Sequence, residues 1–500
     1  MKNHTVDILV IGGGINGTGI ALDAVGRGLS VILCEQNDLA SGTSSKSTKL
    51  IHGGLRYLEH GAFKLVHESL NEREVLMKKA PHLISPLTFI IPYQPQSRPP
   101  WMIRLGLWIY DHLGHRVTLP GSESVSLEGT DFGAPLKTSF KKGFSYSDCR
   151  VDDARLVVEN AVAAKALGAE IFTRCRVIRY GVKDKRWEVE TEYKGNRQIF
   201  YARVLINATG PWIQSQAFSM KLVKGSHIIV PRVYEGEHAY LIQHSDKRVI
   251  FAIPYEKHFT LIGTTEEMYE GDPSKAHIDE TEKNYLVNAF NEYFQHTLTL
   301  KDIVADYSGV RPLIGDGSEN PSNISREYIL SLDQSQGAPI LSVFGGKITT
   351  YRRLAEHAME KISHFFPQMK SAWTKEATLP GGDIPHGSLS SYIHAMGIKY
   401  PFLSESELSR LVHCYGTRME MILAPFEGAD RAPAFGDLAP FEKGAAPQAQ
   451  GFYEQELAYS VTHEFTQTAD DFLTRRTKLY LSKNAPTLQK IRDWFAKNRL

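Results

Sequence analysis

Residues 6–36 read VDILVIGGGINGTGIALDAVGRGLSVILCEQ, and this stretch decides the fold. Its first apolar run, residues 8–11, has no polar position, which is typical of a strand covered on both faces of a sheet. A glycine-rich turn, a helical segment with small residues and a second apolar run at 31–34 follow. The order strand, glycine turn, helix, strand predicts an α/β fold with a Rossmann-like parallel sheet.

The turn carries Gly12, Gly14 and Gly17 in G-x-G-x-x-G spacing. In such a turn the first glycine permits the tight bend, the second lets the backbone approach a pyrophosphate, and the third lets the helix pack closely on the strand. The N-terminal end of the helix stabilises the negative charge of the phosphates. Glu35, at the end of the second apolar run, is placed to accept hydrogen bonds from the hydroxyls of an adenosine ribose. The pattern predicts a dinucleotide site but does not choose between NAD and FAD.

Two later apolar runs also end in glycine turns, VLINATGPW at 204–212 and LSVFGGKITTYRRLAEHAMEKI at 341–362. The stretch SGTSSKSTKLIHGG at 41–54 offers hydroxyls and unhindered amides that suit pyrophosphate and ribityl oxygens. Three glycine-marked strand ends suit one long cofactor that spans the edge of a sheet, which favours FAD. The residues expected to contact this cofactor are Gly12, Gly14, Ile15, Asn16, Gly17, Glu35, Thr43, Ser44, Ser45, Lys49, Leu50, His52, Gly53, Gly54, Val177, Ala208, Gly210, Gly345, Gly346, Lys347, Ile348 and Thr349.

Taken together, several segments resemble the FAD-dependent glycerol-3-phosphate dehydrogenases of the aerobic, quinone-reducing type. Besides the stretches quoted above, they are LIHGGLRYLEHG (50–61), FSYSDCRVDDARL (144–156), KGSHIIVPR (224–232), YSGVRPL (307–313) and DDFLTRRTK (470–478). The resemblance covers nearly the whole chain. It implies oxidation of sn-glycerol 3-phosphate to dihydroxyacetone phosphate by hydride transfer to FAD, with the electrons passed on to a membrane quinone. It also implies a homodimer.

Between the cofactor segments the pattern changes to short apolar runs separated by turns, from RWEVETEY at 186–193 to FTLIGTT at 259–265. This pattern predicts an antiparallel sheet inserted into the parallel domain. Helical periodicity dominates after a Pro/Gly-rich linker at 379–390. The expected organisation is a discontinuous FAD-binding domain (1–80, 145–215 and 305–370), a substrate-binding cap (81–144 and 216–304) and a C-terminal α-helical domain (388–500).

A phosphate-bearing substrate needs a cationic clamp, and the planar fork of arginine binds phosphate oxygens in pairs. The candidates are Arg56, Arg311 in SGVRPL and Arg326 in SREY. The alternative for each is an ordinary surface ion pair, which is the commoner fate of an arginine in a loop. The match to the family motifs favours Arg56 and Arg311 as substrate ligands.

The oxidation also needs a group that takes the proton of the substrate hydroxyl. His227 is a candidate general base, and Lys347, on the Gly-Gly turn, is expected to reach the substrate near the flavin. The assignment of the base among His227, Lys347 and Arg311 stays open. Tyr57 either packs against the flavin ring or contacts the substrate.

Bulk composition excludes several classes of partner. The formal net charge of +1 gives no argument for nucleic-acid binding, and the 4 cysteines form no CxxC pair that would indicate a metal site. Their scatter fits a reducing compartment. No apolar run reaches the roughly 18 residues of a membrane-spanning helix.

Quinone reduction without a spanning helix predicts peripheral attachment, so we expect a cytoplasmic protein on the inner face of the cytoplasmic membrane. The candidate surfaces are WMIRLGLWIYDHLGHR at 101–116 and the last helix, near 487–500. The alternative is that both pack against the protein itself.

Other activities remain open at this point. A glycerol-3-phosphate oxidase would use oxygen in place of quinone. An amine or amino-acid oxidase of the same fold would need an arginine for a carboxylate but no phosphate site. A flavoprotein without enzymatic activity would not need the cluster of Arg56, Arg311 and Lys347.

Overall fold

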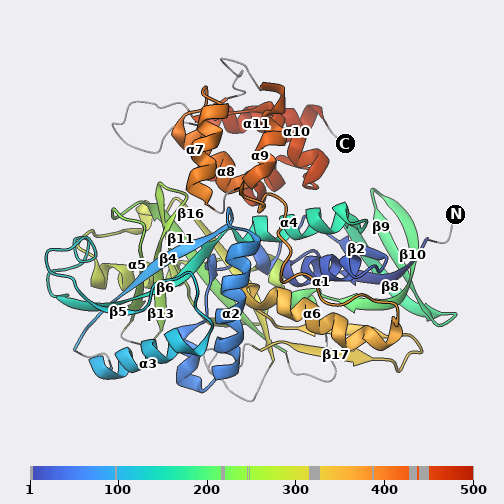
Figure 1. The fold of residues 1–500 in the computed structure, drawn as a ribbon, viewed down its shortest axis with the longest axis horizontal. Coiled ribbons are helices and arrows are strands. Elements are labelled where there is room, and N and C mark those ends of the chain that lie inside the picture. Colours follow the sequence, from blue (N-terminus) through green and yellow to red (C-terminus); the bar gives the residue numbers. More distant parts are fainter. Residues whose placement is uncertain are drawn as a thin grey trace.

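A computed structural model of the chain describes residues 4–95, 98–214, 220–244, 246, 248–314, 327–385, 388–426, 436–438, 450–482 and 484–498. Figure 1 shows two sheet-based regions side by side, with a group of helices from the C-terminal part of the chain above them. Arg326, one of the expected substrate ligands, lies outside the described residues.

The first sheet is built around β1 (His4–Ile11), which lies between β10 (Asn196–Asn207) and β2 (Val31–Glu35) in parallel pairing. Ile8 and Val10 of β1 face the core beneath the helices, whereas Leu9 faces the opposite core around Trp187. Burial on both faces explains why the run at 8–11 is apolar throughout. The strand order is β17 (Ile329–Asp333), β18 (Ile340–Phe344), β10 (Asn196–Asn207), β1 (His4–Ile11), β2 (Val31–Glu35) and β7 (Glu170–Thr173), with β8 (Cys175–Lys183) and β9 (Arg186–Tyr193) joined to β10 through β9.

Three helices pack together on one face of this sheet (Figure 1). They are α1 (Ile15–Gly26), α4 (Asp153–Ala166) and α6 (Tyr351–Ile362). The helix of the glycine fingerprint, α1, lies between the other two, so its small residues serve close packing against both. The carboxyl ends of β1, β10 and β18 meet at one edge, and this edge carries the three glycine turns of the sequence.

The second sheet is mostly antiparallel and is covered on both faces. Helix α5 (Glu280–Tyr293) packs on one face, and α2 (Phe63–Lys79) and α3 (Pro100–Leu113) pack on the other. The strand order is β15 (Glu267–Tyr269), β11 (Met220–Pro231), β14 (Phe259–Gly263), β13 (Val249–Tyr255), β12 (Ala239–Gln243), β4 (Ile84–Pro92), β6 (Lys142–Val151) and β3 (Leu50–Ile51), with β16 (Ala305–Ile314) beside β11 and β5 (Glu123–Ser126) beside β6.

Three strands of the second sheet lie in ranges that the sequence analysis assigned to the FAD-binding domain. These are the whole of β3, most of β6 and the whole of β16. Strand β3 pairs with β6 in antiparallel register. The structure pairs β6 with β4 along its length, from Gly143 to Val151, and pairs β16 with β11 over ten positions. Backbone pairing therefore places all three strands in the second sheet, while their ends contribute to the border between the two regions.

The described residues of the C-terminal region are mostly helical, with one short antiparallel pair of strands. Its elements are α7 (Leu389–Lys399), α8 (Glu405–Tyr415), α9 (Met419–Leu423), β19 (Gly436–Leu438), β20 (Gln450–Phe452), α10 (Glu454–His463), a π-helix (Asp471–Arg476) and α11 (Ala485–Lys497). Ser404 and Glu407 form the capping box that opens α8. Within the described part of the chain, no helix has both the length and the apolar composition needed to cross a membrane.

Candidate active site

One elongated cavity of about 940 Å³ extends from the carboxyl edge of the first sheet to the second sheet. Its wall includes the three glycine turns, at 12–14, 208–210 and 345–346. Opposite them lie residues from β16, β12 and β13, and the far end is lined by α3. Segments that are hundreds of residues apart in the sequence thus form the wall of a single long site.

The first glycine turn is as tight as its spacing predicts. Gly12 has a φ of +113°, and a Cβ added to it would lie 2.5 Å from the carbonyl oxygen of Ala208. A Cβ on Gly17 would lie 1.9 Å from the carbonyl oxygen of Gly12. Helix α1 begins directly after Gly14, and its first amide, at Ile15, donates to the hydroxyl of Ser44 at 3.0 Å. The positive end of the helix therefore points at the cavity, as an anion site requires.

Glu35 lies on the cavity wall next to this turn. Its Oε2 accepts from the backbone N–H of Gly13 at 2.6 Å, and its Oε1 accepts from that of Asn37 at 2.7 Å. Burial raises the pKa of Glu35, and the two amide hydrogen bonds oppose that rise. The carboxylate is thus held in a fixed position on the cavity wall, next to the glycine turn.

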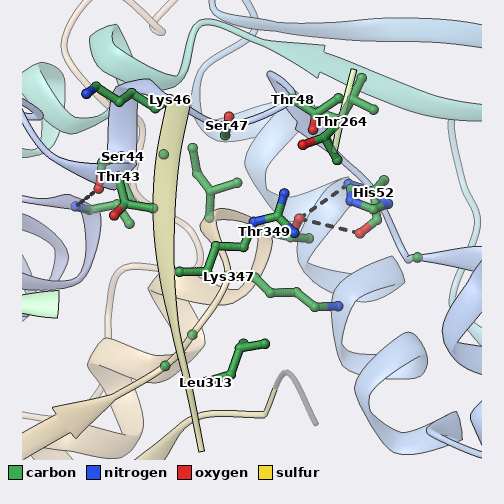
Figure 2. Close-up of a pocket in the computed structure, with 18 of the residues that line it drawn as sticks. Thr43, Ser44, Lys46, Ser47, Thr48, His52, Thr264, Leu313, Lys347 and Thr349 are labelled. Atoms are coloured by element: carbon green, nitrogen blue, oxygen red, sulfur yellow. Dashed lines mark hydrogen bonds between the residues drawn. The ribbon is translucent and has the colours of Figure 1, made fainter. Parts of the chain in front are cut away.

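The hydroxyl-rich segment 43–54 forms one side of the cavity, and the Gly-Gly turn of residues 345–349 faces it (Figure 2). The Thr43 hydroxyl donates to the carbonyl of Val310 at 2.6 Å, which ties this segment to the second sheet. Thr349 Oγ1 accepts from the backbone N–H of His52 at 3.3 Å and donates to its carbonyl at 3.4 Å. These hydrogen bonds hold the two walls at a fixed separation.

Four residues expected to contact the cofactor do not lie on the wall: Gly17, Ser45, Lys49 and Gly53. Lys49 instead pairs with buried Asp153, at 2.8 Å, and donates to the carbonyl of Ser45. The Gly53 amide donates to the hydroxyl of Tyr110. These residues support the wall from behind, and the remaining expected cofactor residues line it.

A cationic cluster, defined here as Arg56, Arg311, Lys347 and Glu266, lies on the same wall. Glu266 links the two arginines: its Oε2 is 3.4 Å from Arg56 Nη1, and its Oε1 is 3.6 Å from Arg311 Nη1. The Lys347 ammonium lies 3.9 Å from the ring centroid of Tyr57. Three positive charges and one negative charge leave a net charge that a phosphate dianion would balance.

His227 is brought close to this cluster but does not line the cavity. Its side chain is fully buried, and its ring stacks on Tyr307 with the centroids 4.8 Å apart. Its Nε2 lies 3.0 Å from the hydroxyl of Thr48, which does line the cavity. Burial, then the positive charges of Arg311 and Lys49, lower the pKa of His227 well below its ordinary value, so the imidazole is neutral.

The sequence analysis did not single out Glu266, Thr48 or Thr264, all of which line the cavity. Thr264 and Glu266 come directly after the end of β14. Polar residues in this position, after an apolar run, could have been recognised in the sequence as site candidates. Thr48 carried no such signal, because its role depends on the packing of β11 behind it.

The far end of the cavity is apolar and reaches the surface of α3. Leu107 and Tyr110 bury one face of this helix, while Trp101, Leu105 and Trp108 are 65%, 47% and 53% exposed on the other. The residues of α2 and α3 that line the cavity are Phe63, Met102, Ile103, Leu105, Gly106 and Ile109. An exposed apolar surface therefore continues into the site.

Fold and site together define a flavin-dependent oxidoreductase. The sequence profile of the FAD dependent oxidoreductases matches residues 7–352, and that of the C-terminal domain of alpha-glycerophosphate oxidase matches residues 372–497. The predicted α/β fold, its C-terminal helical domain and the FAD cofactor are thereby confirmed. The wall fits this cofactor, because it offers the N-terminal end of α1 and three glycine turns along one cavity.

Proteins that match this chain over most of their own length identify the family within the flavin-dependent oxidoreductases. The aerobic glycerol-3-phosphate dehydrogenase of Escherichia coli (strain K12) is 47% identical, over 98% of this chain and 97% of its own. The D-erythritol 1-phosphate dehydrogenase of Brucella abortus (strain 2308) is 45% identical over 98% of both chains. A glycerol-3-phosphate dehydrogenase from Bacillus halodurans, solved with FAD, superposes with a TM-score of 0.75 at 26% identity, covering 99% of this chain and 90% of its own. The chain belongs to the family of the FAD-dependent glycerol-3-phosphate dehydrogenases.

Proposed function

We propose that this enzyme oxidises sn-glycerol 3-phosphate to dihydroxyacetone phosphate and passes the electrons to a membrane quinone. The observation that carries the substrate is the cationic cluster, which lies on the wall of the FAD cavity with two arginines sharing one carboxylate. An amino-acid oxidase of this fold needs one cation for a carboxylate. Three cations around a single acid suit a phosphate dianion better.

Bound FAD supplies the acceptor for the hydride that leaves C2 of the substrate. Arg56 and Arg311 bind the phosphate, and Glu266 holds their guanidinium groups in place before the substrate arrives. Two residues are placed to take the proton of the C2 hydroxyl. Neutral His227 receives it through the hydroxyl of Thr48, or Lys347 receives it directly; in the second case Lys347 starts the reaction as a neutral amine and the cluster carries one positive charge fewer.

A second substrate has a specific observation in its favour. The relative named D-erythritol 1-phosphate dehydrogenase matches this chain almost as closely as the glycerol-3-phosphate enzyme. Both substrates are polyol phosphates, so both suit the cationic cluster, and they differ by one hydroxymethylene unit. A comparison of kcat/KM for the two, measured on the same preparation, decides between them.

The exposed face of α3 supports the membrane part of the proposal. Trp101, Leu105 and Trp108 present large apolar side chains to solvent, and other residues of the same helix line the cavity. A quinone dissolved in the bilayer would then meet the site without leaving the apolar phase. Attachment to the inner face of the cytoplasmic membrane and a homodimer belong to the same proposal. Flotation with lipid vesicles and sedimentation in detergent test them.

The test of the activity is anaerobic. Addition of sn-glycerol 3-phosphate should bleach the yellow flavin, and a soluble quinone should restore its colour. Bleaching by D-erythritol 1-phosphate alone would move the assignment to the longer polyol. Bleaching by glycine or another amino acid, with no response to either phosphate, would overturn the proposed substrate class. Recovery of the colour with oxygen but not with quinone would make the enzyme an oxidase.

A further inference from the structure

Residues 464–478 of the C-terminal region form buried ion pairs with the FAD-binding region. They include the DDFLTRRTK segment, whose π-helix begins at Asp471. Figure 1 places the C-terminal helices over α4, on the side of the first sheet that carries α1. None of the described residues 464–478 lies on the cavity wall. Their buried ion pairs with the cofactor region therefore call for a role other than contact with ligand.

The first set of contacts converges on Asp38. Arg476 donates to both oxygens of this carboxylate, at 2.7 Å each, and Arg475 Nε donates to Oδ2 at 2.5 Å. Arg476 is fully buried and Asp38 is 2% exposed. A bidentate pair of this kind, shielded from solvent, fixes the position of the loop that carries the carboxylate.

That loop joins β2 to the hydroxyl-rich segment of the cavity. Asp38 follows Glu35 by three residues. The amide of Ala40 donates to the carbonyl of Gly13 at 3.0 Å, and a Cβ on Gly13 would meet Leu39 Cδ2 at 3.0 Å. The loop is thus pressed onto the glycine turn from one side and held by two arginines from the other.

The second set of contacts holds the neighbouring strand end. Arg174 Nη2 lies 2.8 Å from each carboxylate oxygen of Asp471, and the backbone amide of Arg174 donates to the carbonyl of Asn37 at 2.8 Å. The next residue, Cys175, lines the cavity beside Glu35 and Asn37. Arg475 Nη2 also donates to Asp471 at 2.8 Å, and this hydrogen bond joins the two sets of contacts into one network.

We propose that Asp471, Arg475 and Arg476 act as a brace that sets the affinity of the enzyme for FAD at its adenosine end. They are positioning residues, because they act on the cofactor only through Asp38 and Arg174. The proposal rests on the assignment of Glu35 to the adenosine ribose. The C-terminal domain would thus help to retain FAD, and this role would not depend on the binding of substrate or quinone.

The test measures FAD release from the holoenzyme, followed as flavin fluorescence after dilution, with no substrate present. Asp38→Asn should release FAD roughly 10- to 100-fold faster than the unmodified enzyme, since it removes the charge that both arginines hold. The visible spectrum of the flavin that stays bound should keep its shape, because the isoalloxazine end is remote from the brace. Arg475→Lys should release FAD more slowly than Arg475→Ala, which shows rescue by the retained charge.

A matched control removes a comparable ion pair that does not touch the cofactor region. Arg410 donates to both oxygens of buried Glu456 within the C-terminal domain, at 2.8 Å each. Arg410→Gln should lower the melting temperature without changing FAD release. Glu35→Gln serves as the positive control.

Equal release rates for Asp38→Asn and the unmodified enzyme would overturn the brace. So would equal acceleration in Arg410→Gln, because the effect would then be a general loss of stability. If Asp38→Asn does not fold, Asp471→Asn carries the same comparison. Because no substrate is present, the outcome is independent of the proposed polyol phosphate.

Discussion

His227 lies behind Thr48 as seen from the cavity, with 3.0 Å between the imidazole Nε2 and the threonine hydroxyl. This arrangement separates the two routes proposed for the substrate proton. Thr48→Val removes the hydroxyl at nearly constant volume. If the proton passes through Thr48, kcat should fall about 100-fold or more, while KM changes little. Steady-state kinetics check this, and a Thr48→Val enzyme with unchanged kcat would leave Lys347 as the proton acceptor.

The charge state of His227 makes a second prediction, about pH. Burial, Arg311 and Lys49 lower the pKa of His227 well below its ordinary value of 6.5. As the pH falls through 6.5, the unfolded chain takes up a proton at His227, whereas the folded enzyme does not. The free energy of unfolding therefore decreases as the pH falls below 6.5. The kcat/KM profile should show no acid limb near pH 6.5 from this residue. An acid limb near pH 6.5 whose midpoint shifts in the His227→Asn enzyme would contradict this prediction.

Arg311→Ala should raise the KM for sn-glycerol 3-phosphate roughly 10- to 100-fold, the loss expected for a charged hydrogen bond. The flavin content should stay intact, because Arg311 lies on the part of the wall formed by the second sheet. Steady-state kinetics and the absorbance ratio of flavin to protein measure the two. Arg311→Lys should recover part of the affinity, since it restores the charge without the planar fork. Lost flavin would mean that Arg311 has a structural role.

Glu266→Gln keeps a hydrogen-bond acceptor between Arg56 and Arg311 but removes the negative charge. The cluster then has one more uncompensated positive charge, so inorganic phosphate should inhibit several-fold more strongly. The inhibition constant measures this, and salt should weaken the difference. Glu267→Gln, at the adjacent position, is a control, because Glu267 pairs with Lys224 and does not line the cavity. Weaker inhibition in Glu266→Gln would show that orientation of the arginines outweighs charge.

The apolar face of α3 is tested by placing charge on it. Trp101→Glu with Trp108→Glu should reduce binding to lipid vesicles, and quinone reduction in vesicles should fall with it. Bleaching of the flavin by substrate should be unaffected, since neither side chain lines the cavity. A loss of bleaching would show that the helix supports the active site itself.

Much of the cofactor site could be predicted from sequence because it depends on short-range backbone geometry. The tight approach of Gly17 to Gly12 follows from their spacing alone, and Glu35 ends the strand that follows them. The long-range contacts could not be read in the same way. Lys49 stands in a cofactor-like stretch, yet it pairs with Asp153, 104 residues further along the chain.

The substrate region shows the same limit. Arg311 was recognisable from its motif, whereas the link through Glu266 depends on the packing of β16 beside β11 and of the turn after β14. His227 was expected at the substrate, but the fold of β11 places it one side chain further back. Residue type and motif predicted which segments lie near the cavity, whereas tertiary packing determines which of their side chains face it.

The pair between Asp38 and Arg476 joins residues 438 positions apart in the sequence. During synthesis, the glycine turn and its first strands leave the ribosome long before the arginine that braces them exists. The N-terminal region can begin to fold as translation proceeds, since domains generally fold as units. If the brace sets FAD affinity, tight capture of the cofactor waits until almost the whole chain has been made, and a truncated translation product would not retain it.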